Sequence, residues 1–177
     1  MSEQLKEEGM ALFRRGMYDE ALSKFEAAAQ AFGAADNDLG RAEALNNIGV
    51  VQRVRQEWDA AEEALKGAID LFARAGDDNR HGQALGNLGD FYAFRGNSEM
   101  AAAYYGDGAE HLARSGDRER QAQLLRALSL LRLRQRRVLE AMTYMEQSLM
   151  VRSRLNPLQR LLLLMIRFSG RLMGGRP

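Results

Sequence analysis

The 177-residue chain contains no cysteine and only two prolines. Without cysteine it can form no disulfide scaffold, no thiol nucleophile and no cysteine-ligated zinc site. Its polar, acidic N-terminus does not resemble a secretory signal, and no apolar run approaches the roughly 20 residues that a membrane-spanning helix needs. We therefore expect a cytoplasmic protein.

Residues that favour β-strands are also scarce, because aromatic residues make up only 7% of the chain and Thr, Val and Ile are few. Ala and Leu, which favour helices, are abundant. With 46% hydrophobic and 28% charged residues, the composition is typical of a folded protein rather than of a disordered one. The expected fold class is all-α.

The net charge of +1 conceals an uneven distribution. Residues 1–117 hold 12 basic and 21 acidic residues, whereas residues 118–177 hold 13 basic and 3 acidic residues. The two parts therefore carry balances of −9 and +10. Such an asymmetry bears on association rather than on the fold.

The sequence repeats itself with a period of about 40 residues, in columns of identical or similar residues. Four of these columns are Leu5, Leu45, Leu85 and Leu125; Ala21, Ala61, Ala101 and Ala141; Gly9, Gly49, Gly89 and Ser129; and Ala28, Ala68, Gly108 and Ser148. A repeat of this kind indicates units that cannot bury their apolar faces alone and must stack on their neighbours. We expect four units, at residues 2–38, 39–78, 79–118 and 119–157, followed by a C-terminal amphipathic helix and short tail at 158–177.

Each unit is expected to contain two antiparallel helices, because apolar residues recur within it at the spacing of one helical face. The expected helices span residues 3–15, 18–33, 41–55, 58–74, 81–95, 98–114, 120–135 and 138–155, and a ninth begins at Leu158. The columns of small residues are expected where two helix backbones approach most closely.

Residues at the expected helix ends repeat as well. One column holds Gly76, Gly116 and Asn156, which are suited to the left-handed conformation that ends a helix. The residues that follow the first two, Asp77, Asp78 and Asp117, are expected to cap the next helices through their side chains.

The segments Leu45-Asn-Asn-Ile-Gly49 and Leu85-Gly-Asn-Leu-Gly89 precede columns of a bulky residue, Ala, a large apolar residue and a small one. This order resembles the tetratricopeptide repeat (TPR) over about residues 2–157. The resemblance implies a right-handed α-solenoid of four helix-turn-helix units plus a C-terminal helix, acting as a protein-interaction adaptor. The units are longer than those of the usual repeat, and only Pro157 matches the usual terminal proline. In length they are similar to those of kinesin light chain, spindle-orientation adaptors and bacterial peptide sensors.

Catalysis has little support in the sequence. Phosphate-binding loops, nucleophile elbows and paired zinc-ligand motifs are all missing. Asp107 and His111 lie four residues apart on an expected helix and could touch one metal ion, but two ligands do not make a site. We expect these two residues, and His81, to be ordinary surface residues of a protein that is not an enzyme and has no cofactor.

In TPR arrays the first helices of successive units line a concave groove that holds peptides. The register places Lys6, Met10, Phe13, Asn47, Val50, Arg53, Val54, Asn87, Asp90, Phe94, Arg126 and Leu130 there. Further members of this lining are Arg14, Asn46, Gln83, Leu133 and Arg134.

Two properties of this lining suggest its ligand. Asn47 and Asn87 share one column, and a carboxamide there can donate to and accept from a single peptide unit, as long-unit relatives do. The apolar members favour a ligand with an apolar stripe, either extended or helical. The alternatives are that the asparagines are merely solvated, and that Leu130 and Leu133 are core residues.

Arrays that grip the acidic C-termini of heat-shock chaperones carry a Lys and several Asn in the first two units and a basic pair in the third. Lys6 and Asn47 fit, but Met10 replaces an Asn, and Gln83 and Asn87 replace the basic pair. A carboxylate would lose its charge-assisted partners. The sequence therefore argues against a chaperone tail as the ligand.

The C-terminal segment is predicted to be an amphipathic helix. Its broad apolar face holds Leu158, Leu161, Leu162, Met165, Ile166, Phe168 and Leu172, and is expected to cover the last unit. Arg160, Arg167 and Arg171 lie opposite, and Leu163 and Leu164 beside them are expected to stay partly exposed. An exposed apolar remainder favours a homodimer first, contact with an anionic membrane second, and simple capping third.

Arg132, Arg134, Arg136 and Arg137 form a basic cluster without interleaved aromatic residues, so the sequence argues against nucleic-acid binding. We expect a non-catalytic adaptor that binds a peptide or helix in its groove. The alternative is a peptide-responsive sensor that reorganises on binding.

Overall fold

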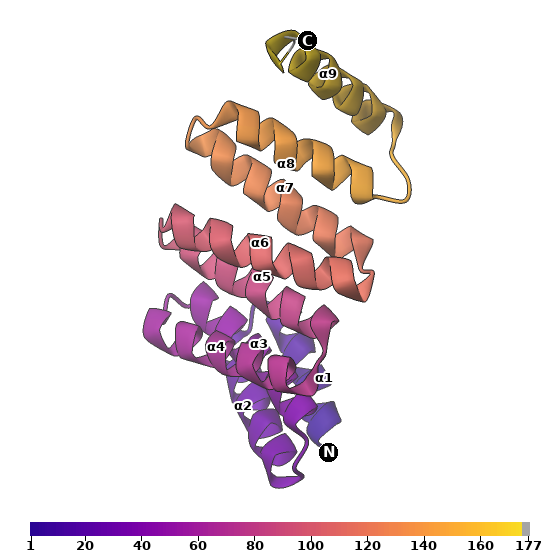
Figure 1. Cartoon of the computed structure of the whole chain (residues 1–177). Coiled ribbons are helices and arrows are strands. Elements are labelled where there is room, and N and C mark those ends of the chain that lie inside the picture. Colours follow the sequence, from indigo (N-terminus) through magenta and orange to yellow (C-terminus); the bar gives the residue numbers. More distant parts are fainter. Residues whose placement is uncertain (175–177) are drawn as a thin grey trace.

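A computed structural model describes the backbone of residues 1–174 and the side chains of residues 1–168. The described residues form nine α-helices: α1 (Ser2–Arg14), α2 (Tyr18–Ala34), α3 (Asp38–Val54), α4 (Trp58–Ala75), α5 (Asp78–Phe94), α6 (Ser98–Ser115), α7 (Arg118–Arg134), α8 (Val138–Val151) and α9 (Pro157–Gly174). Consecutive helices pack as pairs, and the pairs are stacked in a row from α1 and α2 at one end to α9 at the other (Figure 1). The all-α solenoid expected from the sequence is confirmed.

The first helices of the later units begin earlier than predicted, at Asp38, Asp78 and Arg118 rather than at residues 41, 81 and 120. The cause is side-chain capping, which apolar periodicity does not detect. The carboxylate of Asp77 accepts a hydrogen bond from the Arg80 amide at 2.9 Å, as predicted for Asp77. Asp117 does the same in the next unit, whereas Asp78 lies in the first turn of α5 instead of capping it.

Left-handed glycines end two of the second helices, as predicted. The φ angles are +66° at Gly76 and +78° at Gly116. The prediction for Asn156 is wrong, because α8 ends at Val151 and the chain continues in an extended conformation at Arg152. Asn156 instead caps α9, where its side chain accepts from the Gln159 amide at 2.9 Å and Gln159 Oε1 accepts from the Asn156 amide at 3.0 Å.

The columns of small residues lie where paired helices come closest. A Cβ atom added to Gly49 would stand 3.0 Å from the carbonyl oxygen of Ala61. In the fourth unit Ser129 occupies the glycine position, and its hydroxyl donates to the carbonyl of Ala141 at 2.7 Å. The alanines of the facing column are buried, because Ala21, Ala61 and Ala101 are 0% exposed and Ala141 is 4% exposed. Because the facing helix lies so close, only small residues such as Gly, Ala or Ser fit at these positions.

Helix α9 packs mainly on α8, with a face different from the predicted one. Gln159, Leu163 and Ile166 are its half-buried residues, and Arg167 Nε lies 2.8 Å from Glu146 of α8. Of the residues assigned to the covering face, Ile166 packs as predicted, whereas the following are exposed: Leu158, Leu161, Leu162, Met165 and Phe168. Leu164 is exposed as predicted, and Leu172 lies outside the residues whose side chains are described.

The error has a physical reason. Apolar residues occupy more than half of the circumference of α9, so hydrophobicity alone does not choose the packed face. The non-helical connection 152–156, which is extended at Arg152, and the Arg167–Glu146 ion pair set how α9 meets α8. The unpacked apolar surface is consequently larger than the sequence suggested.

His81 and His111 form an unexpected pair between α5 and α6, with ring centroids 4.0 Å apart. Nδ1 of His111 lies 2.6 Å from a carboxylate oxygen of Asp78, and Arg114 lies beside the same carboxylate. Burial, and then the nearby His111, lower the pKa of His81. The predicted surface position is correct for Asp107, which is exposed, but both histidines are half-buried.

We predict that Ala61→Leu lowers the free energy of unfolding by about 1–3 kcal/mol, because a larger side chain overpacks the closest approach of α3 and α4. Urea denaturation measures the change. The neighbouring Ala60 is exposed on the same helix, so Ala60→Leu is the matched control and should change stability little. Equal stability of both variants would contradict the assigned register.

We predict that the protein loses stability as the pH falls from 7.5 to 5.5. The lowered pKa of His81 means that the folded state holds its proton less tightly than the unfolded state, whose histidine titrates near its ordinary value of about 6.5. The contribution is complete above that value and is lost below it. In His81→Gln, which introduces the residue found at position 121 of the next unit, urea midpoints should depend less on pH over this range. An unchanged pH dependence would show that His81 does not cause it.

Candidate functional site

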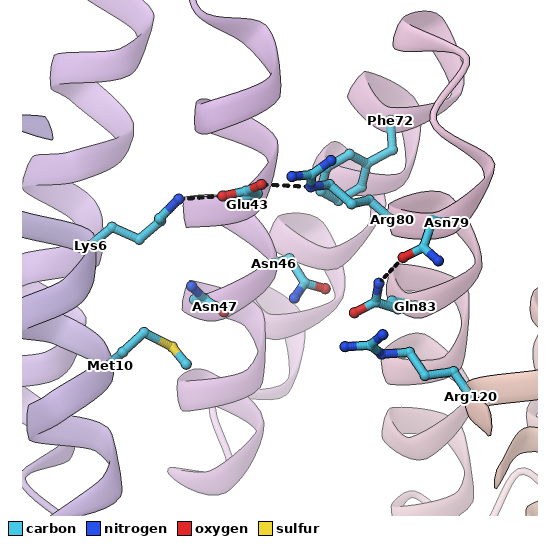
Figure 2. A pocket seen from close by; sticks show the side chains of 10 residues that line it. All are labelled: Lys6, Met10, Glu43, Asn46, Asn47, Phe72, Asn79, Arg80, Gln83 and Arg120. Atoms are coloured by element: carbon cyan, nitrogen blue, oxygen red, sulfur yellow. Dashed lines mark hydrogen bonds and ion pairs between the residues drawn. The ribbon is translucent and has the colours of Figure 1, made fainter. Parts of the chain in front are cut away.

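The first helices α1, α3, α5 and α7 enclose a hollow of about 470 Å³ (Figure 2). Its lining consists of Lys6, Met10, Glu43, Asn46, Asn47, Phe72, Asn79, Arg80, Gln83 and Arg120. The sequence had placed Lys6, Met10, Asn46, Asn47 and Gln83 on this surface, and the structure brings them together. Every lining residue except Phe72, which comes from α4, belongs to a first helix.

Glu43 joins the two sides of this hollow. One of its oxygens pairs with Lys6, and the other lies 2.6 Å from Nε of Arg80 (Figure 2). Burial by itself would lower the pKa of Lys6, but hydrogen bonds and attraction from Glu3 and Glu43 outweigh it and raise that pKa. Lys6 and Arg80 are therefore charged at neutral pH, and their charges are met within the protein.

Arg80 and Arg120 reach the hollow from the first turns of α5 and α7. Each guanidinium folds back onto the carboxylate that caps its own helix, at 2.6 Å from Asp77 and 2.6 Å from Asp117 respectively. Burial opposes ionisation of both carboxylates, but hydrogen bonds from the arginine that follows lower the pKa of each. Sequence reasoning missed Arg80 because it started α5 only at residue 81, whereas Arg120 fell within the expected helix 120–135 but was not assigned to the groove. The Asp-X-X-Arg spacing, repeated at the same position of two successive units, was the available signal.

The two column asparagines differ in their surroundings. The amide nitrogen of Asn87 donates to Asn46 Oδ1 at 2.9 Å, so this side chain links α5 to α3. Asn47 lies in the lining of the hollow, and its carboxamide makes no hydrogen bond with any described residue (Figure 2). Asn47 is thus available to an incoming ligand without breaking an existing contact.

A second hollow of about 290 Å³ adjoins the first, and Gln83 and Arg120 line both. Its lining also includes the predicted residues Asn87 and Asp90. One oxygen of Asp90 accepts a hydrogen bond from the hydroxyl of Tyr105 at 2.6 Å. Burial and this hydrogen bond raise the pKa of Tyr105, which therefore remains a donor.

The remaining predicted groove residues do not line these two hollows. They are Phe13, Val50, Arg53, Val54, Phe94, Arg126 and Leu130. Phe13 is half-buried and its ring lies 5.6 Å from that of Tyr18. Leu130 and Leu133 are 43% and 53% exposed, which excludes the alternative that they are core residues. Together with the exposed Val54 and Phe94, they give the first helices an apolar surface beyond the hollows.

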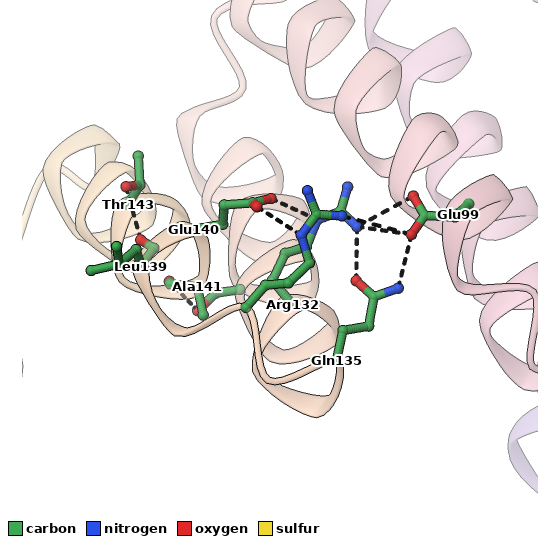
Figure 3. A network of polar contacts seen from close by, with 9 residues as sticks. Glu99, Arg132, Gln135, Leu139, Glu140, Ala141 and Thr143 are labelled. Atoms are coloured by element: carbon green, nitrogen blue, oxygen red, sulfur yellow. Dashed lines mark hydrogen bonds and ion pairs between the residues drawn. The ribbon is translucent and has the colours of Figure 1, made fainter.

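Two of the four clustered arginines, Arg132 (Figure 3) and Arg137, are paired with acidic side chains. Arg132, whose side chain is only 11% exposed, lies 3.4 Å from Glu99 and 3.3 Å from Glu140. Arg137 lies 2.7 Å from Glu140, and Gln135 connects Arg132 with Glu99. This network ties α7 to α6 and α8, whereas Arg134 and Arg136 are exposed and form no ion pair with the described residues.

Among the described residues, no three or more His, Asp or Glu side chains are grouped to hold a metal ion. Asp107 and His111 do not converge, because His111 faces Asp78 instead. Within residues 1–174, no helix has the length and apolar character needed to cross a membrane.

Two solved structures share this architecture. The crystal structure of BtubC (BKLC) from P. vanneervenii superposes with a TM-score of 0.75 at 17% identity, over 99% of this chain and 82% of the other. The Pseudomonas aeruginosa pilF structure superposes with a TM-score of 0.72 at 19% identity, over 97% of this chain and 69% of the other. At these identities the likeness concerns the fold alone.

No curated protein matches the sequence. The sequence pattern of the tetratricopeptide repeat does match, over residues 5–74 and 40–112, which together exceed half of the chain. The helix pairs, their small-residue contacts and this match lead to one conclusion. The chain belongs to the tetratricopeptide repeat family.

Proposed function

We propose that the protein is a non-catalytic adaptor whose first helices bind an extended peptide segment of a partner protein. TPR domains are in general protein-interaction scaffolds, and the proposal assigns that role to the two adjoining hollows. The unengaged carboxamide of Asn47 is the observation that carries it. A single carboxamide can donate to a peptide carbonyl and accept from a peptide amide, which holds a backbone without reading its side chains.

The charges of the hollow support a ligand that need not be acidic. Glu43 meets the charges of Lys6 and Arg80, and Asp117 meets that of Arg120. An acidic chaperone tail would have to compete with these carboxylates for its partners. A neutral peptide backbone would leave them intact.

Exposed apolar residues extend the surface beyond the hollows. Val54, Phe94 and Leu130 are 40%, 67% and 43% exposed on α3, α5 and α7. They favour a ligand with apolar side chains flanking the segment that the carboxamides hold. An amphipathic helix laid on the same strip is the alternative form of the ligand.

A peptide-responsive sensor is the alternative function. The two functions differ in what happens to the stacked pairs when the peptide binds. Small-angle X-ray scattering should give an unchanged radius of gyration for an adaptor, and a distinct decrease for a sensor.

Helix α9 supplies a second attachment surface in this proposal. Its exposed apolar face can take a second copy of the chain or an anionic membrane, and the charges beside that face discriminate between the two. The cytoplasmic location expected from the sequence stays a prediction.

We predict that Asn47→Ala weakens the binding of a groove peptide by about 1–3 kcal/mol, or roughly 5- to 150-fold, because a buried peptide unit loses its partner. Peptides selected from a random library supply the ligand, and fluorescence anisotropy measures their affinity. Asn87→Ala should weaken binding too, with a small additional loss of stability because Asn46 also loses its partner.

The matched control is Gln30→Ala, which removes a carboxamide from α2, outside both hollows. It should leave both affinity and melting temperature unchanged. Selected peptides that bind the Asn47→Ala, Asn87→Ala double variant as tightly as the wild type would place the binding surface elsewhere.

A further inference from the structure

We infer that the exposed apolar face of α9 docks onto an anionic lipid surface, with the helix lying in the plane of the interface. This inference concerns a surface remote from the groove and does not depend on the peptide proposal. The first observation is that α9 packs against less of its neighbour than any other helix of the array does. The connection before it, residues 152–156, is non-helical and longer than the two- or three-residue connections between the earlier units.

The exposed face is large and continuous along the helix. Leu158, Leu161, Leu162, Leu164, Met165 and Phe168 are between 38% and 74% exposed. A terminal helix that only capped the array would turn such residues inward and show water a polar side. An apolar surface of this kind marks an interface.

The charged residues that α9 and the connection before it contribute are all arginines. From residue 147 to the end of the sequence there is no Asp or Glu, whereas there are six arginines. The side chains of Arg154 and Arg160 are exposed and form no ion pair with the described residues. Arg167 lies on the same side as Arg160 and is half-exposed, although Glu146 pairs with it. A helix with leucines and a phenylalanine on one face and arginines alongside is suited to an anionic interface.

The same charges disfavour a second copy as the occupant. A two-fold contact brings identical faces together, so the arginines of both helices would meet. Neither helix carries a carboxylate that could neutralise them. Anionic headgroups supply the missing negative charge, and the apolar side chains then enter the boundary between headgroups and acyl chains.

The charge balance of the whole chain agrees with this orientation. The acidic residues concentrate in residues 1–117, and Figure 1 shows α1 and α2 at the end of the array opposite α9. An anionic surface attracts the basic end and repels the acidic end. The array would therefore stand with its N-terminal units directed away from the lipid.

Vesicle flotation of the full chain tests the inference. We expect the protein to float with vesicles made of two parts phosphatidylcholine to one part phosphatidylglycerol, and at least fivefold less with pure phosphatidylcholine. The variant Leu161→Ser, Met165→Ser should lower binding at least tenfold, because it removes exposed side chains and spares the packed face. Arg154→Gln, Arg160→Gln should reduce binding severalfold on anionic vesicles and leave the weak binding to neutral vesicles unchanged.

The matched control is Met100→Ser, which removes an exposed apolar side chain from α6, outside the groove. It should float like the wild type, and circular dichroism should show unchanged helix content in all variants. Absence of flotation with either vesicle would overturn the inference. So would a dimer in light scattering that depends on Leu161 and Met165 while vesicles fail to bind, because the surface would then belong to a second copy.

Discussion

The closest approach between paired helices is the constraint on which the rest of the structure depends. Where Gly49 faces the carbonyl of Ala61, no side chain larger than a methyl group has room on either helix. The equivalent glycines of the first and third units, Gly9 and Gly89, are also closely approached, there by the rings of Phe25 and Tyr105. Small residues at this position therefore allow each pair to pack closely, and the pairs stack in a regular row. Regular stacking in turn brings α1, α3, α5 and α7 side by side, and their facing side chains enclose the hollows. The groove is thus a consequence of small residues that lie elsewhere in the unit.

The fourth unit meets the same constraint in a different way. Ser129 replaces the glycine, and its hydroxyl bonds to the carbonyl of the facing alanine, Ala141. Ser148 repeats the device by donating to the carbonyl of Ala122 at 2.7 Å. A buried hydroxyl is tolerated here because its hydrogen bond replaces the water that it loses. The departure from glycine therefore preserves the helix pair.

The sequence predicted the helix pairs well because their determinants repeat at a fixed period. It predicted contacts between units less well, because these depend on residues that do not repeat. Asn87 donates to Asn46 of the unit before. The residue that Asn47 would meet at the same place in the first unit is Lys6, which pairs with Glu43 instead. The arginines of the hollow were missed because a capping carboxylate, not an apolar period, places each of them there. The prediction of the packed face of α9 was wrong because the connection 152–156, which does not repeat in the other units, orients that helix.

Pairing of charges explains why the two ends of the molecule behave differently. In the acidic half, the carboxylates of Glu43 and Asp77 pair with Lys6 and Arg80. The basic side chains that line the hollow therefore have acidic partners within the protein. In the basic half, Glu99 and Glu140 pair with Arg132 and Arg137, and Glu119 and Glu146 pair with Arg152 and Arg167. Arg154 and Arg160, just before and within the helix with the least packing, are exposed and form no ion pair with the described residues. A surface that combines exposed apolar side chains with unpaired arginines is best matched by a partner that offers both negative charge and an apolar interior. The hollow, whose basic side chains are already paired, does not require a charged ligand.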